Sequence, residues 1–345
     1  MNNFTYMTDR NFSKGRKYIG ASDMATISGI NPYKTPLQLW EELTGKTEPF
    51  HGNSRTAWGH KQEPMILGEY VRKVYGENFA NGFIYSRLDG KEKFNDLHSW
   101  TEAMAGNRLC AHADLLDLSG DFPIIIQAKN TGEFAAGSRK KDKNKGYDPE
   151  DFSSSGIPLA VYLQEQWEMM CYGISVSYVA VLIGGYDWRL YGPIDYSKKT
   201  CNALLTLAER MLDLVDRDEP PKPETWDDVV RLFPDFKPDT KTVVSGDDEF
   251  KCRSMLHEYA KLSEKEKDIG KKKDDIKNAL GLYLGGNQYL QTPEGITLAS
   301  ASEIPGRETV SVKELKKNKE LFSAVESAGL IKIGKEYRKL DIKNI

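Results

Sequence analysis

The chain has 345 residues, of which 39% are hydrophobic and 29% are charged, and its formal net charge is −3. This composition is typical of a globular protein, and the length is sufficient for two domains. The small negative charge gives no global attraction to nucleic acid, so any polyanionic partner has to bind a local basic patch.

Four widely spaced cysteines include no Cys-x-x-Cys pair. This spacing argues against a zinc ribbon or a disulfide framework and favours a reducing cytoplasm. No apolar run approaches the ~18 residues of a membrane span, and residues 1–20 are polar, without the apolar core of a secretory signal. We therefore expect a cytoplasmic protein that does not enter a membrane.

The segment IGASDMATISGINPYKTPLQLWEELTG predicts two short helices near the start of the chain. Ser22 is a suitable N-cap for the first helix. Thr35 is a suitable N-cap for the second, with Pro36 at its first position and Gly45 at its end.

A third helix is predicted over WGHKQEPMILGEYVRKVYG, with Pro64 near its start and Gly76 at its end. Glu63 shares a helical face with the apolar residues Ile66, Leu67, Tyr70 and Val74. Its carboxylate is therefore expected on the buried side, where it can contribute to a site. The simpler interpretation is a favourable acid at a helix N-terminus.

Two consecutive strands are predicted over residues 108–118 and 122–130, joined by a Ser-Gly-Asp turn. Residues 131–158 are loop-like. A helix over PLAVYLQEQWEMMCYG, strands over SYVAVLIGG and WRLYGPID, and a helix over residues 197–216 follow. This order predicts an α/β (α+β) domain with a mixed sheet flanked by helices.

The predicted domains are a core at residues 1–215, a Pro-rich linker at 216–246 and an accessory domain at 247–345. The accessory domain begins with a long charged helix or helical hairpin, on which Leu262, Ile269 and Ile276 recur every seven residues. A small β-hairpin with a Pro-Glu-Gly turn follows it.

Three polar side chains are predicted to meet on the first strand pair. Alternate residues of a strand share a face, so a hairpin can bring Asp114 close to Gln127 and Lys129. Mg²⁺ prefers oxygen ligands, commonly one or two carboxylates with water and substrate phosphate. Lys129 could orient a water or stabilise charge on a phosphate, and Glu63 could add a second carboxylate. The competing interpretation is a cross-strand ion pair of Asp114 with Lys129.

The blocks IGASDMATISGINPYKTPLQLW, WGHKQEP, AHADLLD, IIIQAK and YLQEQ occur in this order. In these blocks the chain resembles the lambda-exonuclease-like, YqaJ-type viral recombinase family of PD-(D/E)XK nucleases. The resemblance implies a restriction-endonuclease-like core and an Mg²⁺-dependent exonuclease, with Mn²⁺ as an alternative ion. Such an enzyme resects double-stranded DNA from 5′ ends and leaves 3′ tails for a single-strand annealing protein. It further implies a homo-oligomeric ring and a phage or prophage origin in a bacterial cytoplasm.

By this resemblance, Asp114, Gln127 and Glu63 are the metal ligands and Lys129 is the motif lysine. The glutamines of the following helix are two residues apart and cannot face the same way. We expect Gln166 to be the one that joins the catalytic residues. The remaining candidates, for the 5′ phosphate or the DNA backbone, are Arg16, Lys17, Ser22, Gln164, Arg139, Lys140 and Lys141. The last three belong to the basic run SRKKDKNKG, which is equally consistent with a solvated loop.

Gln127 stands where the family usually has Glu. An amide oxygen can coordinate a cation but brings no charge, so metal affinity should be lower. Gln127 is either a natural variant or an engineered Glu→Gln change that traps an uncleaved complex. Two further functions therefore remain open: a cleavage-impaired chain that binds DNA ends as a platform, and a site-specific or structure-specific endonuclease on the same core.

Overall fold

The computed structural model divides the chain into two compact units, Met1–Pro234 and Asp235–Ile345. The residues that it describes are 18–47, 54–104, 108–131, 156–235, 237, 239–303, 312–328, 330 and 340. Within these ranges, no helix combines the length and the apolar character that a membrane crossing requires.

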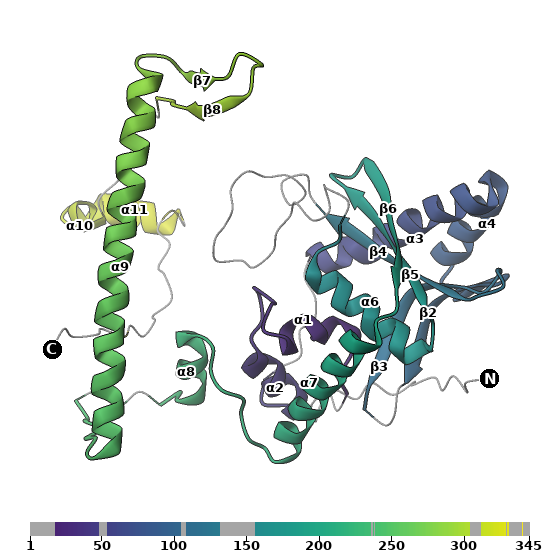
Figure 1. The fold of residues 1–345 in the computed structure, drawn as a ribbon, viewed down its shortest axis with the longest axis horizontal. Coiled ribbons are helices and arrows are strands. Elements are labelled where there is room, and N and C mark those ends of the chain that lie inside the picture. Colours follow the sequence, from purple (N-terminus) through teal and green to yellow (C-terminus); the bar gives the residue numbers. More distant parts are fainter. Residues whose placement is uncertain are drawn as a thin grey trace. The chain divides into compact units, whose positions relative to one another are not determined.

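A six-stranded sheet forms the centre of the first unit, and its strands lie side by side in chain order (Figure 1). The strands are β1 Lys93–Phe94, β2 Leu97–Met104, β3 Cys110–Asp117, β4 Ile124–Thr131, β5 Val176–Ile183 and β6 Asp187–Asp195. Strands β4 and β5 are parallel, whereas all other neighbours are antiparallel. A parallel pair needs a crossover connection, which here contains helix α6, Leu159–Tyr172.

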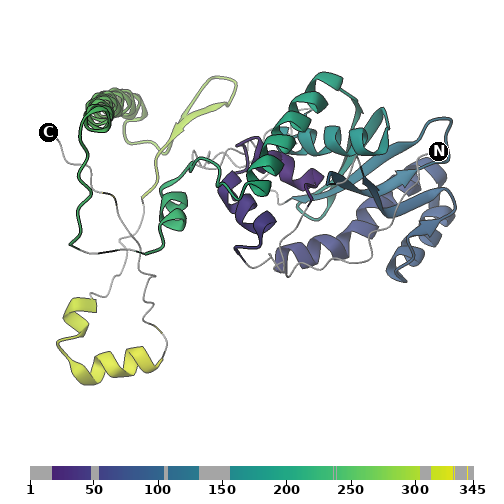
Figure 2. The same ribbon diagram turned by 90° about the horizontal axis from the view of Figure 1, so that it is seen from below.

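Helices cover both faces of the sheet (Figures 1 and 2). The remaining helices of this unit are η2 Ala21–Asp23, α1 Met24–Ile27, α2 Pro36–Thr44, α3 Ser54–Tyr75, α4 Glu77–Leu88, α7 Lys198–Asp216 and α8 Trp226–Leu232. The apolar side chains of α3 and α4 pack on one face, around Phe83 and Leu115. Those of η2, α1, α2, α6 and α7 pack on the other, around Trp167. The predicted mixed sheet flanked by helices is confirmed.

The N-terminal helices differ in part from the prediction. Helix α2 begins and ends as expected, because the Thr35 side chain accepts a hydrogen bond from the Gln38 backbone N–H and Gly45 adopts φ +71°. Ser22, in contrast, is not an N-cap. It lies inside the short helix η2, where the Asp23 carboxylate accepts the Gly20 backbone N–H at 2.9 Å.

Helix α3 begins at Ser54, well before the predicted start. Pro64 therefore lies inside the helix, and Glu63 is in its middle, not at its N-terminus. The interpretation of Glu63 as a helix-terminal acid is wrong. Helix α4 and strands β1 and β2, which follow α3, were not predicted.

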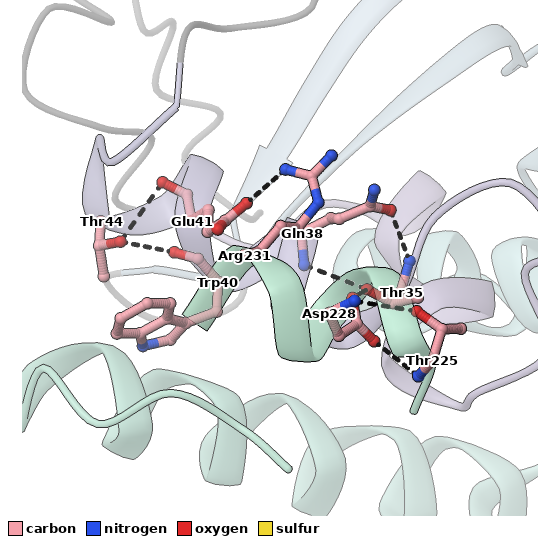
Figure 3. A network of polar contacts seen from close by, with 8 residues as sticks. All are labelled: Thr35, Gln38, Trp40, Glu41, Thr44, Thr225, Asp228 and Arg231. Atoms are coloured by element: carbon pink, nitrogen blue, oxygen red, sulfur yellow. Dashed lines mark hydrogen bonds and ion pairs between the residues drawn. The ribbon is translucent and has the colours of Figure 1, made fainter. Parts of the chain in front are cut away.

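Part of the predicted linker is a helix docked on the core (Figure 3). Thr35, the N-cap of α2, donates its hydroxyl hydrogen bond to Asp228 of α8 at 2.7 Å. Arg231 of α8 forms an ion pair with Glu41 of α2 at 3.0 Å. Asp228 is 1% exposed, and its other oxygen accepts the backbone N–H of Thr225. The linker prediction for 216–246 is therefore wrong over α8, since two tethers fix this helix to α2.

The second unit contains the predicted long helix and hairpin. Its elements are α9 Asp247–Leu284, β7 Tyr289–Gln291, β8 Thr297–Ser300, α10 Val312–Leu315 and α11 Lys319–Ser327. Helix α9 is one continuous helix of 38 residues, so the helical-hairpin alternative is excluded. The three heptad residues Leu262, Ile269 and Ile276 are 56%, 58% and 62% exposed.

Candidate active site

Strands β3 and β4 bring the predicted motif residues together. Leu115 of β3 pairs with Ile126 of β4. One residue further from the turn, Asp114 Oδ2 accepts the backbone N–H of Ala128 at 2.8 Å. Asp114 therefore lies against the stretch of β4 that carries Gln127 and Lys129, as the hairpin predicts.

Helix α6 adds a side chain to this cluster. Lys129 Nζ donates to Gln164 Oε1 at 3.0 Å. Gln164 Nε2 in turn donates to Glu168 Oε1, one helical turn later, at 2.8 Å. Because α6 is the crossover between the adjacent strands β4 and β5, the same connection that makes these strands parallel places Gln164 beside Lys129.

Gln166 is not part of the cluster, contrary to the prediction. Its Nε2 donates to the Asp195 carbonyl at 2.8 Å, and its Oε1 accepts the Ser197 backbone N–H at 2.7 Å. Both partners lie where β6 ends and α7 begins. Gln166 therefore joins α6 to that corner, and Gln164 is the glutamine that reaches the motif lysine.

Glu63 approaches Asp114 from the opposite helical layer. Its carboxylate forms an ion pair with Arg87 of α4 at 2.6 Å, and the two side chains are 10% and 1% exposed. Helix α3 packs against β4, and the charge of Glu63 contributes, after burial, to the raised pKa of Asp114. Glu63 is therefore close to the motif residues, but its negative charge is already balanced by Arg87.

Three acids around Lys129 have raised pKa values. Burial, and then the charge of Glu63, raise the pKa of Asp114 to about 6, although Lys129 opposes this shift. Burial raises the pKa of Glu165 to about 8. Burial, the charge of Glu165 and the charge of Asp114 raise the pKa of Glu168 well above its ordinary value. The cluster has more buried acid than nearby cations balance, so a bound cation would be favourable there.

The oxygen atoms of the cluster partly fit a divalent ion. Gln127 is 4% exposed, and its Oε1 accepts no hydrogen bond from any described residue. A buried, unpartnered oxygen beside Asp114 is a suitable donor for a hard cation such as Mg²⁺, which completes its coordination with water and phosphate. Across the described ranges, however, no group of three or more His, Cys, Asp or Glu residues is arranged to hold a metal. The protein would therefore supply few ligands.

The predicted DNA contacts are placed only in part. Ser22 is exposed and lies in η2, which contacts both β3 and α6. Arg16, Lys17, Arg139, Lys140 and Lys141 lie outside the described residues.

Sequence reasoning missed three buried charged residues of this region, Arg87, Glu165 and Glu168. Two of them follow the predicted Gln164 on α6, where an acid on a helix ordinarily indicates a solvent-facing position. The four-residue spacing of Gln164 and Glu168, which places both on one helix face, is the signal that could have identified Glu168.

One family model matches the N-terminal part of the chain. Residues 12–95 match the family model described as YqaJ-like viral recombinase domain. The matched segment contains the blocks IGASDMATISGINPYKTPLQLW and WGHKQEP with Glu63, and it ends before Asp114. No curated protein matches the chain.

Solved structures that the chain resembles include the alkaline exonuclease LHK-Exo from Laribacter hongkongensis. The match has 13% sequence identity and a TM-score of 0.40, and it covers 60% of this chain and 92% of that one. The complex of LHK-Exo with dAMP matches with 14% identity and a TM-score of 0.38, over 60% and 92% of the two chains.

Proposed function

We propose that this chain is a metal-dependent exonuclease that digests linear double-stranded DNA during phage-type recombination. It would degrade the 5′-ended strand and leave 3′ tails for a single-strand annealing protein. One observation carries the proposal: Asp114 lies against the stretch of β4 that carries Gln127 and Lys129, and Lys129 contacts Gln164 of α6. The viral recombinase match over residues 12–95 supports the DNA substrate.

The side chains of the cluster have distinct tasks in this proposal. Asp114 and Gln127 would hold Mg²⁺, which would supply positive charge beside the scissile phosphate and a polarised water. The Lys129 ammonium donates hydrogen bonds and can hold either the attacking water or a phosphate oxygen. Glu63, balanced by Arg87, keeps a negative group near Asp114 without itself being a free ligand.

A digestion assay tests the proposal. Linear duplex DNA labelled at the 5′ or the 3′ end is incubated with the chain and Mg²⁺ or Mn²⁺, with closed circular DNA in parallel. We expect early release of the 5′ label, survival of the circle and no digestion in EDTA. Cleavage of the circle would instead support the endonuclease alternative.

Lys129→Ala is the decisive variant in that assay. Loss of a group that stabilises the reacting phosphate should lower the rate roughly 100-fold or more, while binding to DNA ends persists. Lys91→Ala, at an exposed lysine of the same unit, is the matched control. Undiminished digestion by Lys129→Ala would refute the assignment of Lys129 to the active site.

A second candidate function is binding of DNA ends without cleavage. It is favoured by one observation: Gln127 is neutral and Glu63 is paired with Arg87, so of the three predicted ligands Asp114 supplies the charge for the ion. Gln127→Glu separates the two functions. If Gln127→Glu alone digests DNA and binds Mg²⁺ more tightly in calorimetry, the unaltered chain is a binder.

The oligomeric ring and the annealing partner belong to the same proposal. Sedimentation velocity of the full chain, with and without a DNA end, measures the oligomeric state. A monomer under both conditions would exclude the ring.

A further inference from the structure

Gln164 has two chemically different ends, and its orientation determines what it offers to Lys129. The amide oxygen only accepts hydrogen bonds, and the amide nitrogen only donates them. An ammonium is a donor only. Gln164 can therefore contact Lys129 through Oε1 alone, as it does at 3.0 Å. If the amide were turned by 180°, Nε2 would face the ammonium and the contact would become repulsive.

Glu168 is the group that selects the productive orientation. Its Oε1 accepts from Gln164 Nε2 at 2.8 Å, on the side of the amide away from Lys129. A carboxyl oxygen at this position favours the nitrogen of the amide and disfavours its oxygen. Lys129, Gln164 and Glu168 thus form a directed chain of hydrogen bonds. Glu168 fixes the orientation of the Gln164 amide, and the amide oxygen fixes the Lys129 ammonium.

We propose that Glu168 is a positioning residue for Lys129, acting through the orientation of the Gln164 amide. This inference rests on the proposed nuclease function, because Lys129 has to be the group that acts on the phosphate. Glu168 is itself 0% exposed, so it would act through Gln164 and not by touching the substrate.

The surroundings of Glu168 support a functional explanation for this acid. Burying a carboxyl group is unfavourable unless it is fully hydrogen-bonded. Glu168 Oε2 accepts no hydrogen bond from the described residues, and the neighbouring Glu165 is fully buried as well. Stability alone therefore does not explain an acid here. The contact with Gln164 holds in either protonation state, since a neutral carboxyl still offers its carbonyl oxygen as an acceptor.

Two substitutions at this position test the proposal. In Glu168→Gln, the new amide oxygen can still accept from Gln164. In Glu168→Met, the volume is similar but no acceptor remains. We expect Glu168→Met to lower kcat roughly 10- to 100-fold with little change in KM, and Glu168→Gln to recover most of that loss. Glu168→Met removes a buried acid but also leaves Gln164 Nε2 without its acceptor, so kcat is compared at a temperature at which Tm measurements show every variant to be folded.

A double-substitution cycle separates positioning from a general structural effect. If Glu168 acts through Gln164, adding Glu168→Met to Gln164→Ala should lower kcat no further. Additive losses, or equal losses in Glu168→Gln and Glu168→Met, would overturn the proposal.

A readout that does not depend on activity distinguishes this inference from the proposed function. Hydrogen exchange at the Gln164 side-chain amide, followed by NMR, should be slow in the unaltered chain and in Lys129→Ala. It should be fast in Glu168→Met. Fast exchange in the unaltered chain would overturn the positioning role whether or not the chain digests DNA. Slow exchange with no digestion by the unaltered chain would refute the nuclease function alone. Slow exchange together with full activity of Lys129→Ala would refute the role of Lys129 and, with it, the positioning role proposed for Glu168.

Discussion

Strand β3 carries two aspartates, three residues apart, whose surroundings are opposite in kind. Asp117 is 3% exposed and accepts hydrogen bonds from Tyr70 at 2.9 Å, from Tyr75 at 2.6 Å and from the Ser119 hydroxyl at 2.7 Å. Asp114 accepts one backbone N–H, and burial followed by the charge of Glu63 raises its pKa to about 6. A satisfied carboxylate indicates a structural function, whereas an under-satisfied one indicates a site for a ligand.

Among the substitutions that test this difference between Asp114 and Asp117, Asp114→Asn should have the largest effect. Removing the negative charge that would hold the cation should lower the rate of DNA digestion roughly 100-fold or more, measured with end-labelled duplex. The exposed Asp121→Asn, in the same hairpin, should digest normally. An active Asp114→Asn would show that the strand pair is only a scaffold.

The same variant should change how stability depends on pH in EDTA. The pKa of Asp114 is raised from 3.8 to about 6, so the folded state binds more protons than the unfolded state between these values. Its contribution to stability is therefore lost as pH rises through that window. In thermal melts between pH 4 and 6, the Tm of the unaltered chain should therefore fall more steeply with rising pH than the Tm of Asp114→Asn.

The next largest effect concerns stability at the buried ion pair. Arg87→Met removes the buried cation that balances the Glu63 carboxylate, so the free energy of unfolding should fall by about 3–5 kcal/mol. Denaturant titration measures this loss. The double variant Glu63→Gln, Arg87→Met should recover much of it, and failure to recover would mean that Arg87 stabilises α4 through other contacts.

Asp117→Leu should lower stability and leave catalysis intact, whereas Asp114→Asn should lower catalysis. The donors Tyr70 and Ser119 lose their buried acceptor, so stability should fall by about 1–3 kcal/mol while kcat is retained at a temperature where the variant is folded. A selective loss of kcat would contradict the structural assignment of Asp117.

The smallest expected effect is at the docked helix α8. Asp228→Ala removes the acceptor of the Thr35 hydroxyl and of the α8 N-terminal backbone, which should cost about 1 kcal/mol. Limited proteolysis after α7, compared with Asp227→Ala at the adjacent exposed acid, should detect the loosened helix. Equal cleavage of both variants would show that Asp228 does not hold α8.

The sequence predicted the strands that carry the site because their patterns are local. Alternation placed Asp114 and Lys129 on a hairpin, and cap residues such as Thr35 marked the limits of α2. It did not predict α4, although Phe79, Phe83 and Ile84 of this helix pack into one hydrophobic cluster with α3 and the sheet. Which glutamine of α6 faces the motif lysine depends on packing against β6 and α7, and that information is not local.

The sequence also did not predict which charged residues are buried. Glu168 and Arg87 resemble solvent-facing residues in sequence, and burial of each depends on a partner in another turn or helix. The docking of α8 was missed because the prolines that precede this helix indicated an open linker, although Thr225 and Asp228 form a capping box that the sequence displays.

The tether between α8 and α2 has a practical consequence for preparing the first unit as a separate fragment. A truncation after residue 216, at the end of α7, would remove the partners of Thr35 and Glu41 and uncover the surface that they hold. Ending the fragment after Pro234 would retain both attachments. Expression trials that compare these two end points should give a better-behaved product from the longer one.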